Sequence, residues 1–360
     1  MSDRRVRLWL MMPLICAIVM PSSAYSQAST APKPTSTRRT IRLLLNSGFS
    51  GANAWLLLAD ARGYFRYEGL EVRFTPGRGA YTAAIRMVTD SFDFGFGDVN
   101  ALIEESSIRQ ETAPTAVFML FNRSPSAIAV AKDSPITAPK QLPGRTIIGH
   151  PTDVALNTFD AFAARALLDP ALVTIQPDSS AWPALLDALA TKKADGVFGY
   201  LSTISAAIES TGRDPSDVVR FIAFRDVAPE LYGSALMASR TMIRDEPEIV
   251  RAFVRAANRG LAAAVNDPDA AITELVKRDP AQRVEVERNR LLRTLNGDMG
   301  AAEGRKLGIG DVDPKRLVLA IKLVHDTSRL PRLPAWDEIF TRDFLPPLSD
   351  RIKTLGEPAK

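Results

Sequence analysis

Short apolar runs alternate with amphipathic segments along the chain, and they do so twice in the same order. The first series has apolar runs at residues 40–45, 70–74 and 92–96, with helix-like segments at 54–61 and 77–90 between them. Short apolar runs bounded by turn residues are typical of buried strands. Strands that alternate with helices predict a mainly parallel sheet with helices on its faces.

The second series repeats this order from about residue 145. Its clearest match is DGVFGY at residues 195–200, which corresponds to DFGFGD at residues 93–98. Each has an aspartate with a glycine four residues later at the predicted strand exit, and each follows an apolar helix at a nearly equal spacing. Two βαβαβ units predict an α/β protein of two lobes. The second unit comprises a strand at 145–149, a loop and helix within 150–168, a strand at 172–176, and a helix and strand within 181–200.

Two further strand-like segments lie outside these units, at residues 127–136 and 232–243. We expect them to be the hinge crossings between the lobes. Residues 40–126 then form the first lobe, 127–235 the second, and 236–360 return to the first. The returning part is helical, with an apolar stripe that predicts packing onto the first lobe. The stripe comprises Ile249, Phe253, Ala256, Ala257 and Leu261.

The N-terminus has the pattern of a secretory signal peptide. Three arginines within the first seven residues precede an apolar run at 8–20, which small and polar residues follow. This run is too short to span a bilayer, which takes about 20 apolar residues. We expect a cleaved signal peptide at residues 1–28, with cleavage after Ala24 or Ala28, and a flexible leader rich in Ser, Thr and Pro at residues 29–39.

Cysteine usage excludes several kinds of chemistry. Cys16 is the single cysteine and lies within the predicted signal peptide. The residues before it, Pro13-Leu14-Ile15, do not fit a lipoprotein signal, so we expect no lipid anchor. A secreted chain without this residue has no disulfide, thiolate nucleophile or sulfur ligand. Its length of roughly 330 residues exceeds what one core serves and agrees with two lobes.

Charge and motifs exclude other functions. The net charge of +4 falls to +2 when the three arginines and one aspartate of the signal peptide are removed, and no basic run remains to favour nucleic acid. We find no nucleophile elbow, P-loop or HExxH motif, and no cluster with metal-ligand spacing. We therefore expect no catalytic residue, metal or cofactor. The two histidines, His150 and His325, are expected at a cleft lip and on a helix.

Several segments resemble the NMT1/THI5-like group of transporter substrate-binding proteins, which are related to nitrate, sulfonate and taurine receptors. The most specific are ADARGYFRYEGLEVRF at residues 59–74 and DFGFGDVNAL at residues 93–102. Looser matches lie at 138–149, 192–199 and 246–271. The resemblance implies a type II periplasmic-binding-protein fold with a ligand cleft between the lobes. It also implies a monomeric periplasmic receptor that closes on a small molecule and docks on the permease and ATPase subunits of an ABC importer.

Loops at the carboxyl ends of parallel strands form the binding crevice in α/β sheets. Here these loops are residues 46–53, 77–81 and 97–100 in the first lobe, and 150–153 and 200–202 in the second. The segment 121–125 enters the hinge, at the expected floor of the crevice. The candidate ligand-binding residues are Ser47, Phe49, Asn53, Arg78, Tyr81, Asp98, Asn100, Asn122, Arg123, Asp153, Tyr200 and Tyr232.

Two acidic residues at strand exits define the expected polarity of the site. Asp98 and Asp153 each precede a predicted helix, where an aspartate either caps the helix or accepts hydrogen bonds from a ligand. A carboxylate at a helix N-terminus occupies the place that favours an anion, so the sequence disfavours simple oxoanions as ligands. Arg78 or Arg123 would instead suit a ligand carboxylate, if either faces the cleft.

Aromatic residues at the same exits suggest a flat ligand. Phe49, Tyr81 and Tyr200 are the expected clamp, whereas Trp55 and Phe121 are better explained by core packing. With two cleft acids, these rings favour a planar nitrogen heterocycle such as a thiamine-precursor pyrimidine, or an aromatic acid if an arginine faces inward.

Two other functions fit the resemblance less well. The pyrimidine-synthesising enzymes of this group need a suitably placed histidine, a lysine and metal-binding cysteines, and they work with cytosolic cofactor. A secreted chain without cysteine disfavours that enzyme class. A receptor for a membrane sensor would have the same fold and is not distinguished by the sequence.

Overall fold

The computed structural model describes residues 38–353 and 355. The predicted signal peptide, most of the predicted leader and Cys16 lie outside the described residues. The expected leader boundary at residue 39 is wrong, because Arg39 is already the first residue of strand β1. Within the described part of the chain, no helix is both long and apolar enough to cross a membrane.

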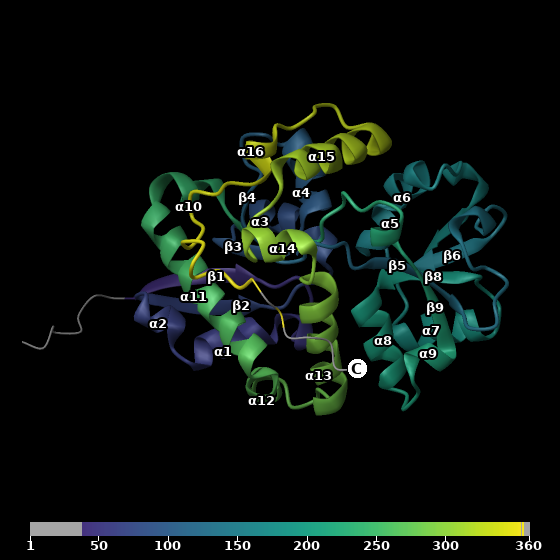
Figure 1. Ribbon diagram of the computed structural model, residues 1–360, viewed down its shortest axis with the longest axis horizontal. Coiled ribbons are helices and arrows are strands. Elements are labelled where there is room, and N and C mark those ends of the chain that lie inside the picture. The colour runs from purple at the N-terminus through teal and green to yellow at the C-terminus, as the bar shows by residue number, and fades with distance from the viewer. Residues whose placement is uncertain (1–37, 354, 356–360) are drawn as a thin grey trace, which may run out of the picture. The chain divides into compact units, whose positions relative to one another are not determined.

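The first sheet has five strands in the order β2-β1-β3-β10-β4 (Figure 1). β1 pairs in parallel with β2 and β3, whereas β10 is antiparallel to both β3 and β4. Four of the five strands therefore run in one direction, so the sheet is mainly parallel, as the sequence predicted. The strands are β1 (Arg39–Leu44), β2 (Leu70–Thr75), β3 (Phe94–Asp98), β4 (Thr115–Met119) and β10 (Ser234–Ala238).

The second sheet repeats this arrangement in the order β7-β6-β8-β5-β9. β6 pairs in parallel with β7 and β8, and β5 is the single antiparallel strand, between β8 and β9. The two βαβαβ units read from the sequence are thus confirmed as equivalent parts of two lobes. The strands are β5 (Ser126–Ala131), β6 (Thr146–Gly149), β7 (Thr174–Pro177), β8 (Gly196–Tyr200) and β9 (Val219–Ala223).

The matching glycines of β3 and β8 have a structural reason. A Cβ on Gly97 would lie 2.3 Å from the Cβ of Ala83, and a Cβ on Gly199 would lie 2.7 Å from the ring of Trp182. In both lobes the helix before the central strand therefore contacts the strand's main chain directly. The repeated Asp-x-x-x-Gly pattern marks this close approach, and it places Asp98 and Tyr200 at equivalent strand ends.

The segments that cross between the sheets are not the ones expected. β5 and β10 are interior strands of their sheets, so residues 127–136 and 232–243 do not form the crossings. The chain crosses at residues 120–125, between β4 and β5, and returns at residues 224–233, between β9 and β10. The apolar character of these segments instead reflects burial, which is complete in β10 and in all of β5 except Ala131.

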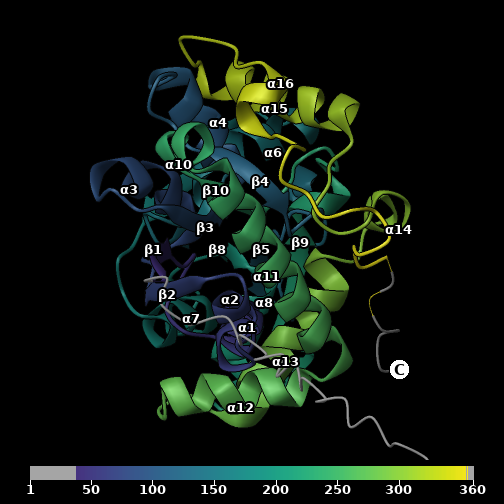
Figure 2. The same ribbon diagram turned by 90° about the vertical axis from the view of Figure 1, so that its left-hand side faces the viewer.

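Two layers of helices enclose the first sheet. One face packs against α1 (Ala54–Ala61) and α11 (Pro247–Asn266), and the other against α3 (Ala83–Thr89), α4 (Val99–Ile108) and α15 (Pro314–Ser328). Figure 2 shows α11 lying across its face of the sheet. The predicted stripe on α11 is confirmed: four of its five residues are buried and Ile249 is partly buried. The returning segment thus completes the first lobe.

The segment GYFRYEGL at residues 63–70, part of the stretch that carries the family resemblance, has a structural role. Gly63 and Gly69 both have φ of 76°, in the left-handed region that glycine favours, and Phe65 between them is fully buried. These glycines end α1 and turn the chain into β2. The other helices are α2 (Tyr64–Tyr67), α5 (Val154–Asn157), α6 (Phe159–Arg165), α7 (Trp182–Ala190), α8 (Leu201–Glu209), α9 (Pro215–Val218), α10 (Arg240–Asp245), α12 (Pro268–Arg278), α13 (Val284–Arg293), α14 (Ala302–Leu307) and α16 (Trp336–Ile339).

Candidate functional site

A cavity of about 710 Å³ lies between the two sheets. Its volume is within the roughly 300–1,000 Å³ typical of small-molecule sites. Strand-exit loops of both lobes line it, as predicted, together with Phe121 of the first crossing segment and two residues of α13. The polar and aromatic lining residues are Asn46, Ser47, Arg78, Phe121, His150, Thr152, Asp153, Ser179, Ser180, Trp182, Tyr200, Ser202, Thr203, Ser210, Glu287 and Arg290.

Four of the twelve candidate residues line this cavity: Ser47, Arg78, Asp153 and Tyr200. Ser47 and Arg78 come from the loops after β1 and β2, and Asp153 and Tyr200 from those after β6 and β8. Each of these loops follows a parallel strand at the same edge of its sheet, which is where loops of α/β proteins form a crevice.

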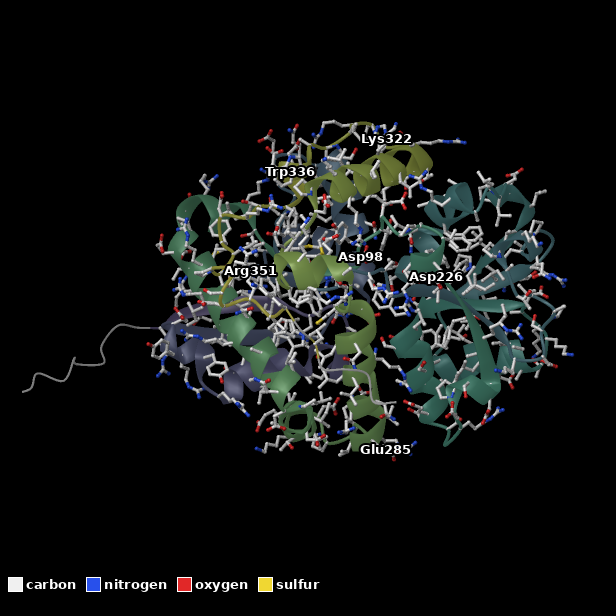
Figure 3. All side chains as sticks on the ribbon, viewed as in Figure 1. Asp98, Asp226, Glu285, Lys322, Trp336 and Arg351 are labelled. Atoms are coloured by element: carbon white, nitrogen blue, oxygen red, sulfur yellow. The ribbon has the colours of Figure 1, made fainter. Side chains whose placement is uncertain are left out.

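Asp98 and Tyr200 meet directly across the two lobes, although only Tyr200 lines the cavity. The Tyr200 hydroxyl donates a hydrogen bond of 3.1 Å to Oδ2 of Asp98, which lies between the sheets in Figure 3. Oδ1 of Asp98 accepts from the main-chain and side-chain nitrogens of Asn100 at 2.8 and 2.9 Å, so it also caps α4. Burial raises the pKa of Asp98 to about 6 despite these bonds. Burial and this carboxylate raise the pKa of Tyr200, which keeps its donating proton.

Asp153 plays the equivalent part in the second lobe. Its Oδ1 accepts a 2.7 Å hydrogen bond from the main chain of Ala155 and caps α5. Burial is the main cause that raises its pKa to about 6, and the nearby charge of Asp98 adds to it. A carboxyl group therefore lines the cavity at the start of a helix.

A second contact joins the lobes beside Asp153. The Thr152 hydroxyl donates to the main-chain oxygen of Arg78 at 3.0 Å, and Nδ1 of His150 lies 2.9 Å from the same hydroxyl. Gly79 approaches Thr152 so closely that a Cβ there would lie 2.8 Å from that hydroxyl oxygen. His150 is thus at the cavity lip, as predicted, and supports an interlobe contact.

Two rings of the expected clamp lie elsewhere. Phe49 packs against the hydrophobic core of the first lobe, and the guanidinium of Arg278 lies 5.4 Å from the centre of its ring. Tyr81 turns away from the cavity and donates a hydrogen bond to Glu104, and burial raises its pKa. Of the three expected rings, only Tyr200 therefore reaches the cavity, because the other two satisfy packing or polar partners within the first lobe.

The asparagines among the candidates organise loops outside the cavity lining. Asn53 bridges Asn46 and the main chain of Gly48, which fixes the loop after β1. Asn100 joins Asp98 to the main chain of Tyr232. The Asn122 side chain accepts from the main chain of Ala301. These residues shape the surroundings of the cleft and do not line it.

Arg123 and Tyr232 also lie outside the cavity lining. The main chain of Arg123 donates to Asp298 at 3.0 Å, and burial lowers the pKa of its guanidinium. Tyr232 is fully buried and donates to Glu303 at 2.7 Å, while Arg316 stacks over its ring. Both residues link crossing segments to the C-terminal helices.

The loop after β7 was missed, although the same rule could have found it. Strand β7 is parallel to β6, so its exit at residues 178–181 must open on the crevice. Ser179, Ser180 and Trp182 line the cavity from there. Trp182 lies against Gly199 and adds another ring to the cavity wall.

No local sequence signal would have identified Glu287 and Arg290. They lie on α13, more than 60 residues beyond the last strand of the second lobe, β9, and reach the cavity through tertiary packing alone. Glu287 Oε2 accepts from the main chain of Gly51 at 2.5 Å. Arg290 donates to Thr203 at 2.8 Å and lies 3.8 Å from Glu287. α13 therefore contributes one acidic and one basic side chain to the cavity lining.

The cavity lining combines aromatic surface with hydrogen-bond donors and acceptors. Trp182, Tyr200 and Phe121 offer aromatic surface, Asp153 offers an acceptor, and hydroxyls and arginines offer donors. Within residues 38–353 and 355, no three histidine or acidic side chains are grouped so that they could hold a metal ion.

These features define an α/β protein with the periplasmic-binding-protein fold, two similar lobes and a cavity between them. A model of the family described as NMT1/THI5 like matches residues 52–271, more than half of the chain. The chain belongs to the NMT1/THI5-like family.

Individual relatives agree with this fold. The riboflavin-binding protein RibY of Chloroflexus aurantiacus is 25% identical over 263 residues, which cover 71% of this chain and 72% of RibY. The periplasmic aliphatic sulphonate-binding protein SsuA of Escherichia coli has a TM-score of 0.64 at 14% identity, over 89% of this chain and 96% of its own. A mutant of DSZB in complex with biphenyl-2-sulfinic acid has a TM-score of 0.58 at 18% identity, over 85% and 98%. Because DSZB is a desulfurization enzyme, the fold serves both binding and catalysis.

Proposed function

We propose that this protein is the periplasmic solute-binding receptor of an ABC importer, and that it holds a planar nitrogen heterocycle between its lobes. The observation that carries the proposal is the cavity of about 710 Å³. Residues of both lobes line it with aromatic rings, hydrogen-bond donors and hydrogen-bond acceptors. Receptors of this kind release their ligand when the lobes separate, which requires a site shared between the lobes.

The lining favours a ring system over a small anion. Trp182 and Tyr200 offer faces on which a ring can stack. Asp153 faces the cavity at a helix N-terminus and would repel a sulfonate or nitrate there. A ligand that carries N–H groups would instead donate to this carboxyl group.

The size of the cavity favours a fused ring over a single one. A volume in the upper part of the usual range of roughly 300–1,000 Å³ exceeds the needs of one pyrimidine ring. RibY, a relative by sequence, is a riboflavin-binding protein. Riboflavin is therefore the first ligand we propose, and a thiamine-precursor pyrimidine the second.

We propose binding rather than catalysis. The described residues contain no cysteine, so a thiolate nucleophile is not available in the cavity. His150 is the single histidine in the lining, and its Nδ1 contacts Thr152, in an interlobe contact. The acidic side chains that line the cavity are engaged as a helix cap and in a main-chain hydrogen bond.

Thermal denaturation with a ligand panel tests this proposal, because a ligand that binds the folded state alone raises the melting temperature. The panel comprises riboflavin, 4-amino-5-hydroxymethyl-2-methylpyrimidine, 4-hydroxybenzoate, an aliphatic sulfonate and nitrate. We expect a ring compound to raise the melting temperature. Shifts with the sulfonate or nitrate alone would contradict the proposed ligand class.

Uptake measurements test the proposed partner. Deleting the gene should reduce cellular uptake of the compound that the purified protein binds, since the permease would lose its receptor. Undiminished uptake would favour the alternative in which the loaded protein signals to a membrane sensor.

A further inference from the structure

We propose that Arg290 of α13 binds an oxygen acceptor of the ligand, either a ring carbonyl or a carboxylate. This inference deepens the proposed function and rests on it. It assigns a ligand-binding role to a residue outside the two strand-exit repeats, and it narrows the ligand to rings that carry oxygen acceptors.

A hydrogen bond holds the Arg290 guanidinium in place, but some of its N–H donors have no acceptor among residues 38–353 and 355. Its Nη2 donates to the Thr203 hydroxyl at 2.8 Å. Its Nη1 is 3.8 Å from Oε1 of Glu287, which is too long for a hydrogen bond. Its Nε is buried and has no hydrogen-bond partner among residues 38–353 and 355. The side chain is 15% exposed and lines the cavity, so a bound molecule can reach it.

The charge of Arg290 is also incompletely balanced. Glu287 is the nearest acid, but its Oε2 already accepts the 2.5 Å hydrogen bond from Gly51. Burial lowers the pKa of Arg290, and the charge of Glu287 only partly opposes this effect. A buried cation with unmet donors is costly, and an oxygen acceptor on a ligand would offset that cost.

The neighbourhood of Arg290 leaves room for such a group. The facing side of α8 presents Thr203, Ala206 and Ala207 to the cavity, and its C-cap residue Ser210 continues this row of small side chains. Asp153 lines the same cavity and accepts hydrogen bonds. A ring with both oxo groups and N–H groups can satisfy Arg290 and Asp153 together.

Arg290 also connects the two lobes. Helix α13 is fixed to the first lobe by the contact between Glu287 and Gly51. It meets α8 of the second lobe through Arg290 with Thr203 and through Arg293 with Glu209. Figure 1 shows α13 between the two lobes. A ligand oxygen on Arg290 would therefore be held by a helix that contacts both lobes.

Calorimetric titration of the secreted chain tests the inference with two probes. Riboflavin carries ring carbonyls, whereas 4-amino-5-hydroxymethyl-2-methylpyrimidine carries none. We expect Arg290→Gln to weaken riboflavin binding about 10- to 100-fold, the effect of losing a hydrogen bond to a charged group. Arg290→Lys keeps the charge but loses the planar donors, and should weaken it by roughly 3- to 10-fold.

Arg293→Gln is the matched control. Arg293 lies one turn further along α13 and joins α8 through Glu209, but it does not line the cavity. We expect riboflavin affinity to change less than about threefold, because this pair is partly exposed. An equal loss in both glutamine variants would overturn the inference, since it would mean that α13 acts only as a strut between the lobes.

The remaining outcomes separate the inference from the proposed function. Native affinity for riboflavin in Arg290→Gln would overturn the inference and leave the receptor function standing. Binding of the pyrimidine without binding of riboflavin would do the same. If the native chain binds neither probe, both proposals fail. If Arg290→Gln does not fold, Arg290→Lys decides, and native affinity in that variant would overturn the inference.

Discussion

At the scale of single residues, the contact between Asp98 and Tyr200 explains most about the cleft. Both residues end equivalent central strands, and their side chains join the lobes by a 3.1 Å hydrogen bond. Asp98 also caps α4, which is one of its two interpretations from sequence, and its other carboxylate oxygen accepts from Tyr200. The carboxylate of Asp98 thus joins the start of α4 in the first lobe to Tyr200 in the second lobe.

The buried position of Asp98 predicts a pH dependence of stability. Its pKa is about 6 in the folded protein, against an ordinary value of 3.8. The folded state therefore holds the proton more tightly, and the stability this contributes is lost as the pH rises through about 6. For pKa values of 3.8 and 6, the free energy of unfolding should be about 1.4 kcal/mol higher at pH 5 than at pH 8 from this group alone. Asp98→Asn should remove that difference in urea denaturation.

Asp214→Asn is the matched control for this measurement. Asp214 caps α9 at the surface, and the Ser216 hydrogen bond lowers its pKa. It is ionised in both states from pH 5 to pH 8, so its replacement should leave the pH dependence unchanged. If Asp98→Asn retains the full difference between pH 5 and pH 8, the carboxyl group of Asp98 is not its source.

Gly79 predicts a steric effect on closure. Its φ is 118°, and a Cβ would lie 2.8 Å from Oγ1 and 2.9 Å from the carbonyl oxygen of Thr152 in the other lobe. Gly79→Ala should push the lobes apart and weaken riboflavin binding at least about tenfold, because fewer molecules reach the closed state. Calorimetry measures the loss. Gly48→Ala, where nothing lies within 4 Å of the added Cβ, should bind normally. Equal affinity in both variants would argue against closure at Thr152.

At the scale of elements, the first lobe depends on the close crossing of α1 and α11. A Cβ on Gly260 would lie 2.3 Å from the Cβ of Ala59 and 2.9 Å from the main-chain oxygen of Trp55. The apolar stripe of α11 predicted which face packs, but not that the helices touch at a glycine.

Gly260→Val should therefore destabilise the protein by about 3 kcal/mol, at the upper end for overpacked cores. The free energy of unfolding in urea measures this change. Ala262→Val on the same helix, at a half-buried position, should cost less than about 1 kcal/mol. Similar losses in both variants would mean that the crossing of α1 and α11 tolerates separation.

Comparison of the predicted with the observed helices and strands shows which features the sequence reveals. The βαβαβ units were predictable because their strands and helices carry local periodicity, and the strand-exit rule then located Asp153 and Tyr200. The crossings were misplaced because a buried interior strand and a hinge strand have the same apolar pattern. Phe49 and Tyr81 were misjudged because sequence does not show which way a loop side chain turns. Arg290 reaches the cavity only through the packing of α13 against α8.

At the scale of the whole molecule, we propose that two lobes of one fold hold one flat ligand. The lobes share strand order but present different surfaces: the first contributes Arg78 and small loop residues, and the second contributes Trp182, Tyr200 and Asp153. α13 adds a third surface with Arg290. A ligand that contacts all three would stabilise the arrangement in which the lobes meet.

Calorimetric titration of riboflavin into the native chain is the decisive measurement for this arrangement. We expect one site per chain with a Kd of about 1 µM or lower, equivalent to about −8 kcal/mol, and a loss of at least about tenfold in Trp182→Ala, which removes a stacking surface. Absence of binding by riboflavin and by the pyrimidine, together with binding of nitrate or a sulfonate, would contradict it.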